Sequence, residues 1–368
     1  MVRTEVALGA AVTGAALVLG VLWDAFETTV LSRRVSRRTQ LTTIFYRITW
    51  PIWRRIARHF PQGNRRENFL TVYGPLSLLL LIALWAAALV LGFGLLAWGM
   101  GAGMRARGGP AELSTAIYMS GTTLFTLGLG DVTPDSAIGR FLTVLESGIG
   151  LGFLALMLAY LPVLSQAFSA RERNVALLDA RAGSPPTATE LLRRHGIEHA
   201  DDALIELLRD WEHWSAQLLE SHVSFPVLAF YRSQHDNQSW VAGLTAMLDT
   251  SALLISVEDR LDKRLTRQAR LTFAMARHAV ADMCRVLGRS AMPLATDRLP
   301  PEARARMLES LATIGVPLPS PDSASAGNLK RLRAMYEPLV HTLSSFLLMP
   351  LPPWVPATPP RENWMTNL

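Results

Sequence analysis

The chain has 368 residues, of which 50% are hydrophobic and only 18% are charged, a balance that excludes a disordered chain and is too apolar for most soluble globular proteins. Its single cysteine, Cys284, excludes an intramolecular disulfide framework. The formal net charge of +6 belongs to the N-terminal part, because residues 1–168 hold 14 arginines and 8 acidic residues, whereas the rest holds 22 basic and 22 acidic residues. We therefore expect a basic, apolar part followed by a charge-balanced one.

The first apolar run extends from Val6 to Trp23, and its 18 residues are near the lower limit for a membrane span. A cleaved secretory signal is the alternative, since the run is N-terminal, short and rich in small residues. Orientation favours an uncleaved span, because cleavage would place the arginine-rich segment that follows outside the cell, whereas arginine-rich loops stay cytoplasmic. We assign residues 1–31 to a first transmembrane helix with the N-terminus outside.

Residues 32–69 form a basic arm with ten arginines and one acidic residue, Glu67. Asp24 and Glu27, just before the arm, are expected to form ion pairs with its first arginines, Arg33 and Arg34. Apolar residues recur at helical spacing within the arm, which is typical of an interfacial helix that lies on anionic lipid. The alternative is a loop that only sets the topology; a nucleic-acid partner is not expected. These apolar residues are Ile44, Phe45, Ile48, Ile52, Trp53 and Ile56.

Two further runs are long enough to cross a membrane. Leu76 to Trp98 holds 23 residues without a charge, which as a helix of ~1.5 Å per residue reaches ~35 Å, more than the ~30 Å hydrocarbon core. A second run covers residues 138–168 and is interrupted only by Glu146 and Arg140. With the basic arm inside, the first of these helices leads outward and the second returns, so residues 100–136 lie outside.

The segment between these two spans has the pattern of a half-helix followed by irregular backbone. Leu113 to Phe125 can make about three helical turns, and glycine then occupies every second position from Thr126 to Asp131. Such a segment is tolerated at membrane depth only where it lines a protected or water-filled cavity. A cation filter needs a row of backbone carbonyls that face one axis. Gly128 and Gly130 can adopt the backbone angles that such a row requires.

At these residues the chain resembles the potassium-channel pore-domain family, with its outer helix, pore helix, T-x-G-[YFL]-G-D filter and inner helix, over residues 70–168. The resemblance implies a homotetramer, because one pore loop cannot surround an ion. It implies that Asp131 supports the filter at its outer mouth. It also implies that bound K⁺ ions are held at the filter residues Thr126, Leu127, Gly128, Leu129 and Gly130.

This filter departs from the usual family pattern at two positions. Leu127 stands where valine is usual, and Leu129 stands where tyrosine is commonest, although leucine also occurs there. The tyrosine hydroxyl would brace the filter from behind. A non-selective cation channel is therefore one alternative to a potassium-selective or potassium-preferring channel, and a non-conducting membrane scaffold or sensor is another.

The inner-helix run contains the candidate gating residues. Gly148, Gly150 and Gly152 weaken a helix, so they serve either as a hinge or as sites of close helix packing. Pro162 either kinks the helix at an inner gate or marks its exit from the membrane. Glu146, an ionisable residue within the membrane, either braces the filter and pore helix or is a protonated structural residue.

After residue 168 the sequence becomes amphipathic, and we predict an all-helical cytoplasmic domain over residues 169–349, followed by an extended proline-rich tail over residues 350–368. Thr187 and Glu190 have capping-box spacing. The run from Trp240 to Val257 reads as a buried core helix rather than a fourth span, since Asp249 lies at its centre. The histidines of this region are expected to be structural. Neither a metal site nor an enzyme activity is expected. The sequence does not identify a regulatory ligand.

The sequence as a whole predicts an all-α membrane protein with a tetrameric potassium-channel-like pore and an all-helical cytoplasmic domain. Its expected function is passive potassium conduction across the cell membrane, gated by the inner helix and the cytoplasmic domain. No cofactor is expected beyond the K⁺ ions in the filter.

Overall fold

The computed structural model describes residues 2–31, 40–106, 112–196, 201–234, 237–293, 296–312 and 324–356. Met1, Arg33 and Arg34 of the basic arm and residues 357–368 of the predicted tail lie outside these ranges. The described residues are nearly all helical and form two compact units. Unit 1 comprises Met1–His59 and Val72–Ser165, and unit 2 comprises Phe60–Thr71 and Gln166–Leu368.

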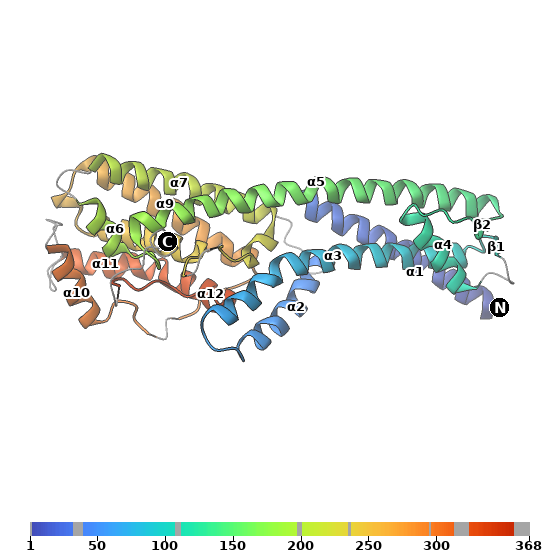
Figure 1. Ribbon diagram of the computed structural model, residues 1–368, viewed down its shortest axis with the longest axis horizontal. Coiled ribbons are helices and arrows are strands. Elements are labelled where there is room, and N and C mark those ends of the chain that lie inside the picture. The colour runs from blue at the N-terminus through green and yellow to red at the C-terminus, as the bar shows by residue number, and fades with distance from the viewer. Residues whose placement is uncertain are drawn as a thin grey trace, which may run out of the picture. The chain divides into compact units, whose positions relative to one another are not determined.

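Unit 1 is built on three long helices, α1 (Val2–Thr29), α3 (Asn64–Gly99) and α5 (Ala137–Ala182), and the short helix α4 (Leu113–Leu124) (Figure 1). Small residues bring α1 and α3 together, since a Cβ atom at Gly14 would lie 2.5 Å from the carbonyl oxygen of Gly92. An apolar core shared by α1, α3, α4 and α5 includes Val18, Val21, Ala25, Leu81, Trp85, Leu89, Phe93, Leu124 and Met157.

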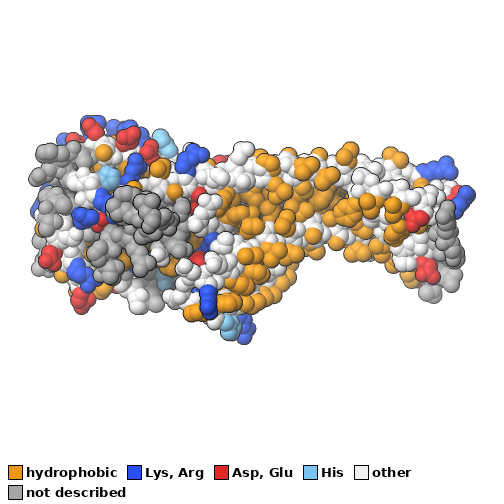
Figure 2. Space-filling model, in the orientation of Figure 1, with side chains coloured by type: hydrophobic (Ala, Val, Ile, Leu, Met, Phe, Trp, Pro, Cys, Tyr) orange, Lys and Arg blue, Asp and Glu red, His pale blue; other side chains and the backbone are white. Residues whose placement is uncertain are grey.

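The same three helices are long and apolar enough to cross a membrane. Large apolar side chains that would be costly in water gather on the outer surface of unit 1, as Figure 2 shows. Among them, Leu79 on α3 is 58% exposed and Val144 on α5 is 74% exposed. Helices long and apolar enough to span a membrane thus lie at the three places where the sequence predicts spans, and the chain has the character of a membrane protein.

Helix α2 (Leu41–Ala57) follows α1, and its start is held by acidic side chains of α1. Asp24, only 3% exposed, accepts hydrogen bonds from the backbone N–H and the hydroxyl of Thr42 and from the indole N–H of Trp85, at 2.7–3.3 Å. Glu27 accepts a bond of 2.7 Å from the side chain of Gln40. The predicted ion pairs of these acids lie outside the described residues, and Asp24 instead caps a helix whose first N–H groups have no intrahelical acceptor.

The prediction of a purely α-helical protein needs one correction. A two-stranded antiparallel sheet pairs β1 (Met104–Ala106) with β2 (Val132–Pro134), with Arg105 opposite Thr133. Strands of three residues are too short to carry a periodic signal in the sequence. The sheet ties the segment after α3 to the segment between α4 and α5.

Unit 2 is helical, and its described helices surround a central one. The central helix is α8 (Trp240–Ser256), in which all residues are buried, and α9 (Lys263–Val286) packs against both α8 and α7 (Asp201–Ser224). This arrangement agrees with the prediction of a core helix rather than a fourth span. The remaining elements are α6 (Ala188–His195), η1 (Pro226–Phe230), η2 (Glu258–Arg260), α10 (Pro301–Ala312), α11 (Ala324–Ala334) and α12 (Glu337–Leu347).

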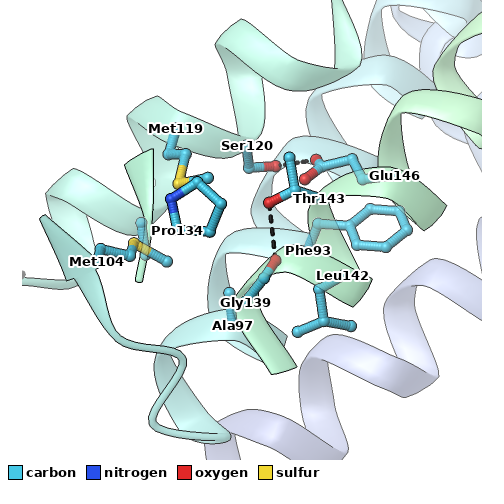
Figure 3. Close-up of a pocket in the computed structure, with 11 residues that line it drawn as sticks. Phe93, Ala97, Met104, Met119, Ser120, Pro134, Gly139, Leu142, Thr143 and Glu146 are labelled. Atoms are coloured by element: carbon cyan, nitrogen blue, oxygen red, sulfur yellow. Dashed lines mark hydrogen bonds between the residues drawn. The ribbon is translucent and has the colours of Figure 1, made fainter. Parts of the chain in front are cut away.

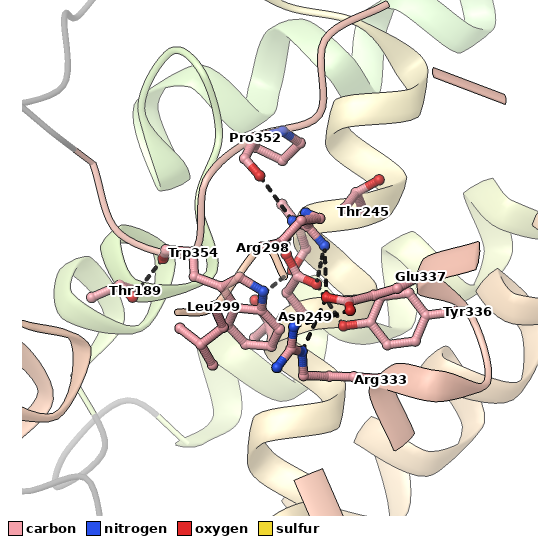
Figure 4. A network of polar contacts seen from close by, with 12 residues as sticks. Thr189, Thr245, Asp249, Arg298, Leu299, Arg333, Tyr336, Glu337, Pro352 and Trp354 are labelled. Carbon is pink, nitrogen blue, oxygen red and sulfur yellow. Dashed lines mark hydrogen bonds and ion pairs between the residues drawn. The ribbon is translucent and has the colours of Figure 1, made fainter. Parts of the chain in front are cut away.

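A polar network lies within unit 2, centred on Asp249 of α8 (Figure 4). Asp249 accepts hydrogen bonds from Arg298 at 2.6 Å and from the hydroxyl of Tyr336 at 2.5 Å. Glu337 accepts from Arg298 at 3.3 Å and from Arg333 at 3.0 Å, so each charge faces an opposite charge. Burial and the neighbouring carboxylate of Asp249 raise the pKa of Tyr336 well above its ordinary value, which keeps its hydroxyl a donor.

The boundary predicted for the C-terminal tail also needs correction. Trp354 is completely buried, its carbonyl oxygen accepts a bond of 2.7 Å from the hydroxyl of Thr189, and the guanidinium of Arg333 lies 5.5 Å from its ring (Figure 4). Residues 350–354 therefore belong to the domain, although they form neither helix nor strand. The predicted cap at α6 is present, since the hydroxyl of Thr187 accepts from the N–H of Glu190 at 3.2 Å.

Candidate functional site

Helix α4 is held closely between α3 and α5. A Cβ atom at Gly94 of α3 would lie 2.8 Å from the side chain of Ile117, and one at Gly150 of α5 would lie 2.4 Å from the carbonyl oxygen of Leu124. These contacts leave no room for a side chain at either glycine. Glycine at these positions therefore fixes the depth at which α4 sits between its neighbours.

The backbone directly after α4 alternates in handedness. Thr126 has φ +57°, Gly128 has φ +55° and Gly130 has φ +74°, so every second residue lies in the left-handed region. For glycine this conformation is easy, whereas for the β-branched Thr126 it costs of order 1–3 kcal/mol. Such a conformation persists only where the surroundings enforce it. The carbonyl oxygen of Thr122 helps to do so, because it accepts from the N–H groups of Leu127 at 2.7 Å and Gly128 at 3.4 Å.

The sequence predicted the freedom of Gly128 and Gly130 but not the strained conformation of Thr126. All residues from 125 to 131 are exposed in the isolated chain. Leu127 is 62% exposed and Leu129 is 64% exposed. The alternating backbone thus lies at the surface of one chain.

The C-terminal end of this segment is tied to α4 by a contact that has no local signal in the sequence. The hydroxyl of Tyr118 donates a hydrogen bond of 2.9 Å to the carboxylate of Asp131. Tyr118 lies on α4, thirteen residues before Asp131, so only the fold brings the two together. Beyond Asp131 the chain enters β2, and the hydroxyl of Ser136 then accepts from the N–H of Gly139 at 3.0 Å and caps the start of α5.

Glu146 lies on α5 and contacts α4. It is 5% exposed and lines a small cavity between α3, α4 and α5 (Figure 3). Its carboxyl group is hydrogen-bonded to the hydroxyl of Ser120, which also contacts the carbonyl oxygen of Val90 at 2.9 Å. One side chain from each of α4 and α5 and one carbonyl of α3 therefore meet at a single point.

The three glycines of the inner helix separate into two kinds. Gly150 packs against Leu124, whereas a Cβ atom at Gly148 or Gly152 would meet no atom of this chain within 4 Å. Within the chain the packing interpretation therefore applies to Gly150, and it finds no support at the G-x-x-x-G pair of Gly148 and Gly152. Helix α5 continues through Pro162 to Ala182. In the described part of the chain, no cluster of three or more His, Cys, Asp or Glu side chains could hold a metal ion.

Comparison with known proteins gives unit 1 a family likeness. Residues 77–164 match the ion-channel family model, a stretch that contains α4, the alternating backbone and Glu146. An uncharacterized membrane protein of Bacillus subtilis (strain 168), YdjJ, is 30% identical over 141 residues, which are 38% of this chain and 40% of that protein. No solved structure matches. Residues 77–164 are therefore similar to an ion-channel domain, and the relative over part of the chain is a membrane protein.

Proposed function

We propose that the chain forms a potassium-conducting channel in which residues 126–130 are the filter. The observation that carries this proposal is the alternation of left-handed residues at positions 126, 128 and 130, directly after α4 and within the ion-channel match. A backbone that alternates in handedness can turn successive carbonyl oxygens toward one axis, which is what replacement of the hydration shell of K⁺ requires. The C-terminal end of α4, with its partial negative charge, ends at this segment and favours a cation there.

The proposed assembly is a homotetramer around that axis. Its support is the exposure of the filter segment, since Phe125, Leu127 and Leu129 are each more than half exposed in one chain. A single filter segment offers ligands from one side only, whereas a ring supplies them from all sides. The open space beside Gly148 and Gly152 is compatible with a neighbouring subunit at that face of α5.

Flux through purified protein in liposomes tests this function. Vesicles with opposed K⁺ and Na⁺ gradients should develop the K⁺ diffusion potential. Equal permeability to both ions would overturn potassium selectivity. Absence of flux under all conditions would favour the non-conducting scaffold.

A non-selective cation channel is the second candidate, and Leu129 is the observation that favours it. A leucine at this position has no hydroxyl with which to brace the filter. The bond between Tyr118 and Asp131 braces the segment only at its outer end. Replacement of Leu129 by tyrosine should therefore raise the K⁺ to Na⁺ permeability ratio if the unmodified channel discriminates weakly.

The proposed orientation places Met1 outside and both Arg54 and Arg173 inside, since arginine-rich segments stay cytoplasmic. A cysteine inserted directly after Met1, or placed at position 54 or 173, in a Cys284→Ser background, can be treated with an impermeant thiol reagent on intact cells. The cysteine after Met1 should react, and those at positions 54 and 173 should react only after permeabilisation. Labelling of position 54 from outside would reverse the orientation.

We further propose that unit 2 regulates opening. Unit 2 is large enough to bury its own core, and it shares the helix α5 with unit 1. A ligand or partner that binds two states of this domain with different affinity would shift the open population. Truncation after Ala170 should therefore change the open probability in single-channel recordings and leave the ion selectivity unchanged. A change of selectivity alone, or loss of the tetramer, would contradict the regulatory role. The truncated protein keeps the candidate gating residues Gly148, Gly150, Gly152 and Pro162.

A further inference from the structure

Helix α2 has two faces of different kind. Its inner face packs on α3. Trp50 is only 2% exposed, its ring lies 4.9 Å from that of Tyr73 on α3, and the hydroxyls of Thr49 and Tyr73 are 2.9 Å apart. Four isoleucines at four-residue spacing form the opposite face, which we call the isoleucine stripe. Their exposed fractions are 40% at Ile44, 57% at Ile48, 57% at Ile52 and 44% at Ile56.

The position of α2 is set by the contacts at its start. Asp24 and Glu27, near the C-terminal end of the span α1, hold Thr42 and Gln40. Tyr73, in the N-terminal third of α3, holds Thr49. Helix α2 therefore lies at the ends of two membrane spans rather than along them.

The charge of α2 and its surroundings is of one sign. No acidic residue occurs between Glu27 and Glu67, whereas the side chains of Arg47, Arg55 and Arg58 are exposed on α2 or directly after it. An apolar stripe flanked by arginines and placed at span ends has the chemistry of a surface helix on an anionic bilayer. If two copies of α2 packed face to face, their arginines would repel each other, because no acidic residue of α2 lies between them.

We propose that the isoleucine stripe of α2 docks into the headgroup region of an anionic lipid leaflet, with the three arginines at the lipid phosphates. Each exposed arginine near such a surface is attracted to the anionic headgroups. The stripe sets the depth of the helix and the arginines set its preference for anionic lipid. The proposal does not depend on conduction, and its tests do not use conduction as a readout.

The depth of the stripe can be measured on the full-length protein. Single cysteines replace Ile48, Ile52 or Asp202 in a Cys284→Ser background, and each carries an environment-sensitive fluorophore after reconstitution into phosphatidylcholine vesicles that contain phosphatidylglycerol. Asp202, in unit 2, is the control because its side chain is 84% exposed and pairs only with the similarly exposed Arg264 in the described part of the chain. Emission at positions 48 and 52 should shift to shorter wavelength and be quenched by lipids that carry a spin label near the headgroup. Emission at position 202 should be quenched by aqueous iodide instead.

Equal iodide quenching at positions 48 and 202 would overturn the proposal. A disulfide between subunits through position 48, without quenching by labelled lipid, would also overturn it and would assign the stripe to a subunit contact.

The role of the arginines is tested with a triple variant, Arg47→Gln, Arg55→Gln and Arg58→Gln. The difference in emission at position 48 between vesicles with and without phosphatidylglycerol should disappear in this variant. The matched control replaces three arginines of α9, Arg264→Gln, Arg267→Gln and Arg270→Gln, and should keep that difference. A triple variant of α2 that still distinguishes the two lipids would show that these arginines do not read the lipid charge.

Discussion

The proposed filter segment and the polar network of unit 2 differ in the exposure of their polar groups. In the network, Asp249 and Glu337 are 0% and 2% exposed, and each faces a guanidinium of the same chain. In the filter segment, residues 125–131 are all exposed and three of them hold left-handed backbone. The carboxylates of the network thus find their partners within one chain, whereas the residues of the filter segment are exposed in one chain.

This difference determines how each region responds to a substitution. A buried charge that loses its partner is costly, so the network is sensitive to any change of one member. The filter segment has few contacts of its own, and its conformation depends on backbone freedom and on a few bonds to α4. Substitutions in the two regions should therefore differ in kind, one affecting stability and the other affecting conduction.

The largest expected effect is loss of conduction in Gly128→Ala. Alanine at φ +55° is strained by about 1–2 kcal/mol in each subunit, while no neighbouring atom lies within 4 Å of the added methyl group. The helices that hold the assembly are untouched. Flux in liposomes should fall to background while size-exclusion chromatography shows an unchanged assembly.

Gly101→Ala is the matched control for this substitution. Gly101 has φ +64°, also faces open space within 4 Å, and lies outside the filter segment. It should carry a similar backbone strain and conduct normally. Normal conduction in Gly128→Ala would show that residues 126–130 are not the filter.

The second prediction concerns the network. Asp249→Asn removes the charge that faces Arg298 at 2.6 Å and should lower the free energy of unfolding of unit 2 by about 3 kcal/mol, because a buried guanidinium then loses its main partner. Asp202→Asn is the control, since Asp202 and Arg264 are 84% and 70% exposed and such a pair contributes less than about 1 kcal/mol. Thermal unfolding of full-length protein, followed by near-UV circular dichroism, compares the two. Similar melting temperatures would contradict a stabilising role for the network.

Much of the fold follows from local sequence signals. The three long apolar helices, the short helix α4, the core helix α8 and the cap at Thr187 all depend on composition and spacing within one segment, and all are present. The glycine pattern also predicted where left-handed backbone occurs at Gly128 and Gly130.

The features that the sequence did not predict depend on distant contacts. Tyr118 meets Asp131, Trp85 meets Asp24 and Trp354 meets Thr189 only because the chain folds back, and none of these pairs has a periodic signal. The left-handed Thr126 contradicts the local preference of a β-branched residue and is imposed by its surroundings. The subunit partners of the filter segment are a prediction from resemblance and exposure, which flux and assembly measurements test.

A third prediction is a loss of stability in acid that originates at His222. Burial, with the nearby guanidinium of Arg171, lowers the pKa of His222 from 6.5 to about 3. The unfolded chain therefore takes up a proton below pH 6.5 that the folded domain refuses, so His222 stabilises the fold at neutral pH and this contribution is lost as the pH falls toward 3. From neutral pH to pH 5 the loss is about 2 kcal/mol.

Comparison with His222→Gln isolates this contribution. The melting temperature of the full-length protein should fall more between pH 7 and pH 5 than that of the variant, because glutamine does not titrate. Parallel pH dependences would mean that His222 is not the group responsible.

The smallest expected effect is that of Glu146→Gln. The hydroxyl of Ser120 has one proton but contacts two oxygens, the carbonyl of Val90 and the carboxyl of Glu146. Both contacts are hydrogen bonds when Ser120 donates to Val90 and accepts from a carboxyl group of Glu146 that carries a proton. A glutamine amide donates in the same way, so Glu146→Gln should keep both the stability and the flux close to those of the unmodified protein.

Glu146→Leu fills the site without a donor and should lower the free energy of unfolding by about 1–2 kcal/mol, measured by thermal unfolding. If Glu146→Gln is as damaging as Glu146→Leu, the carboxyl group acts as a charged acceptor for the hydroxyl of Ser120 rather than as a hydrogen-bond donor.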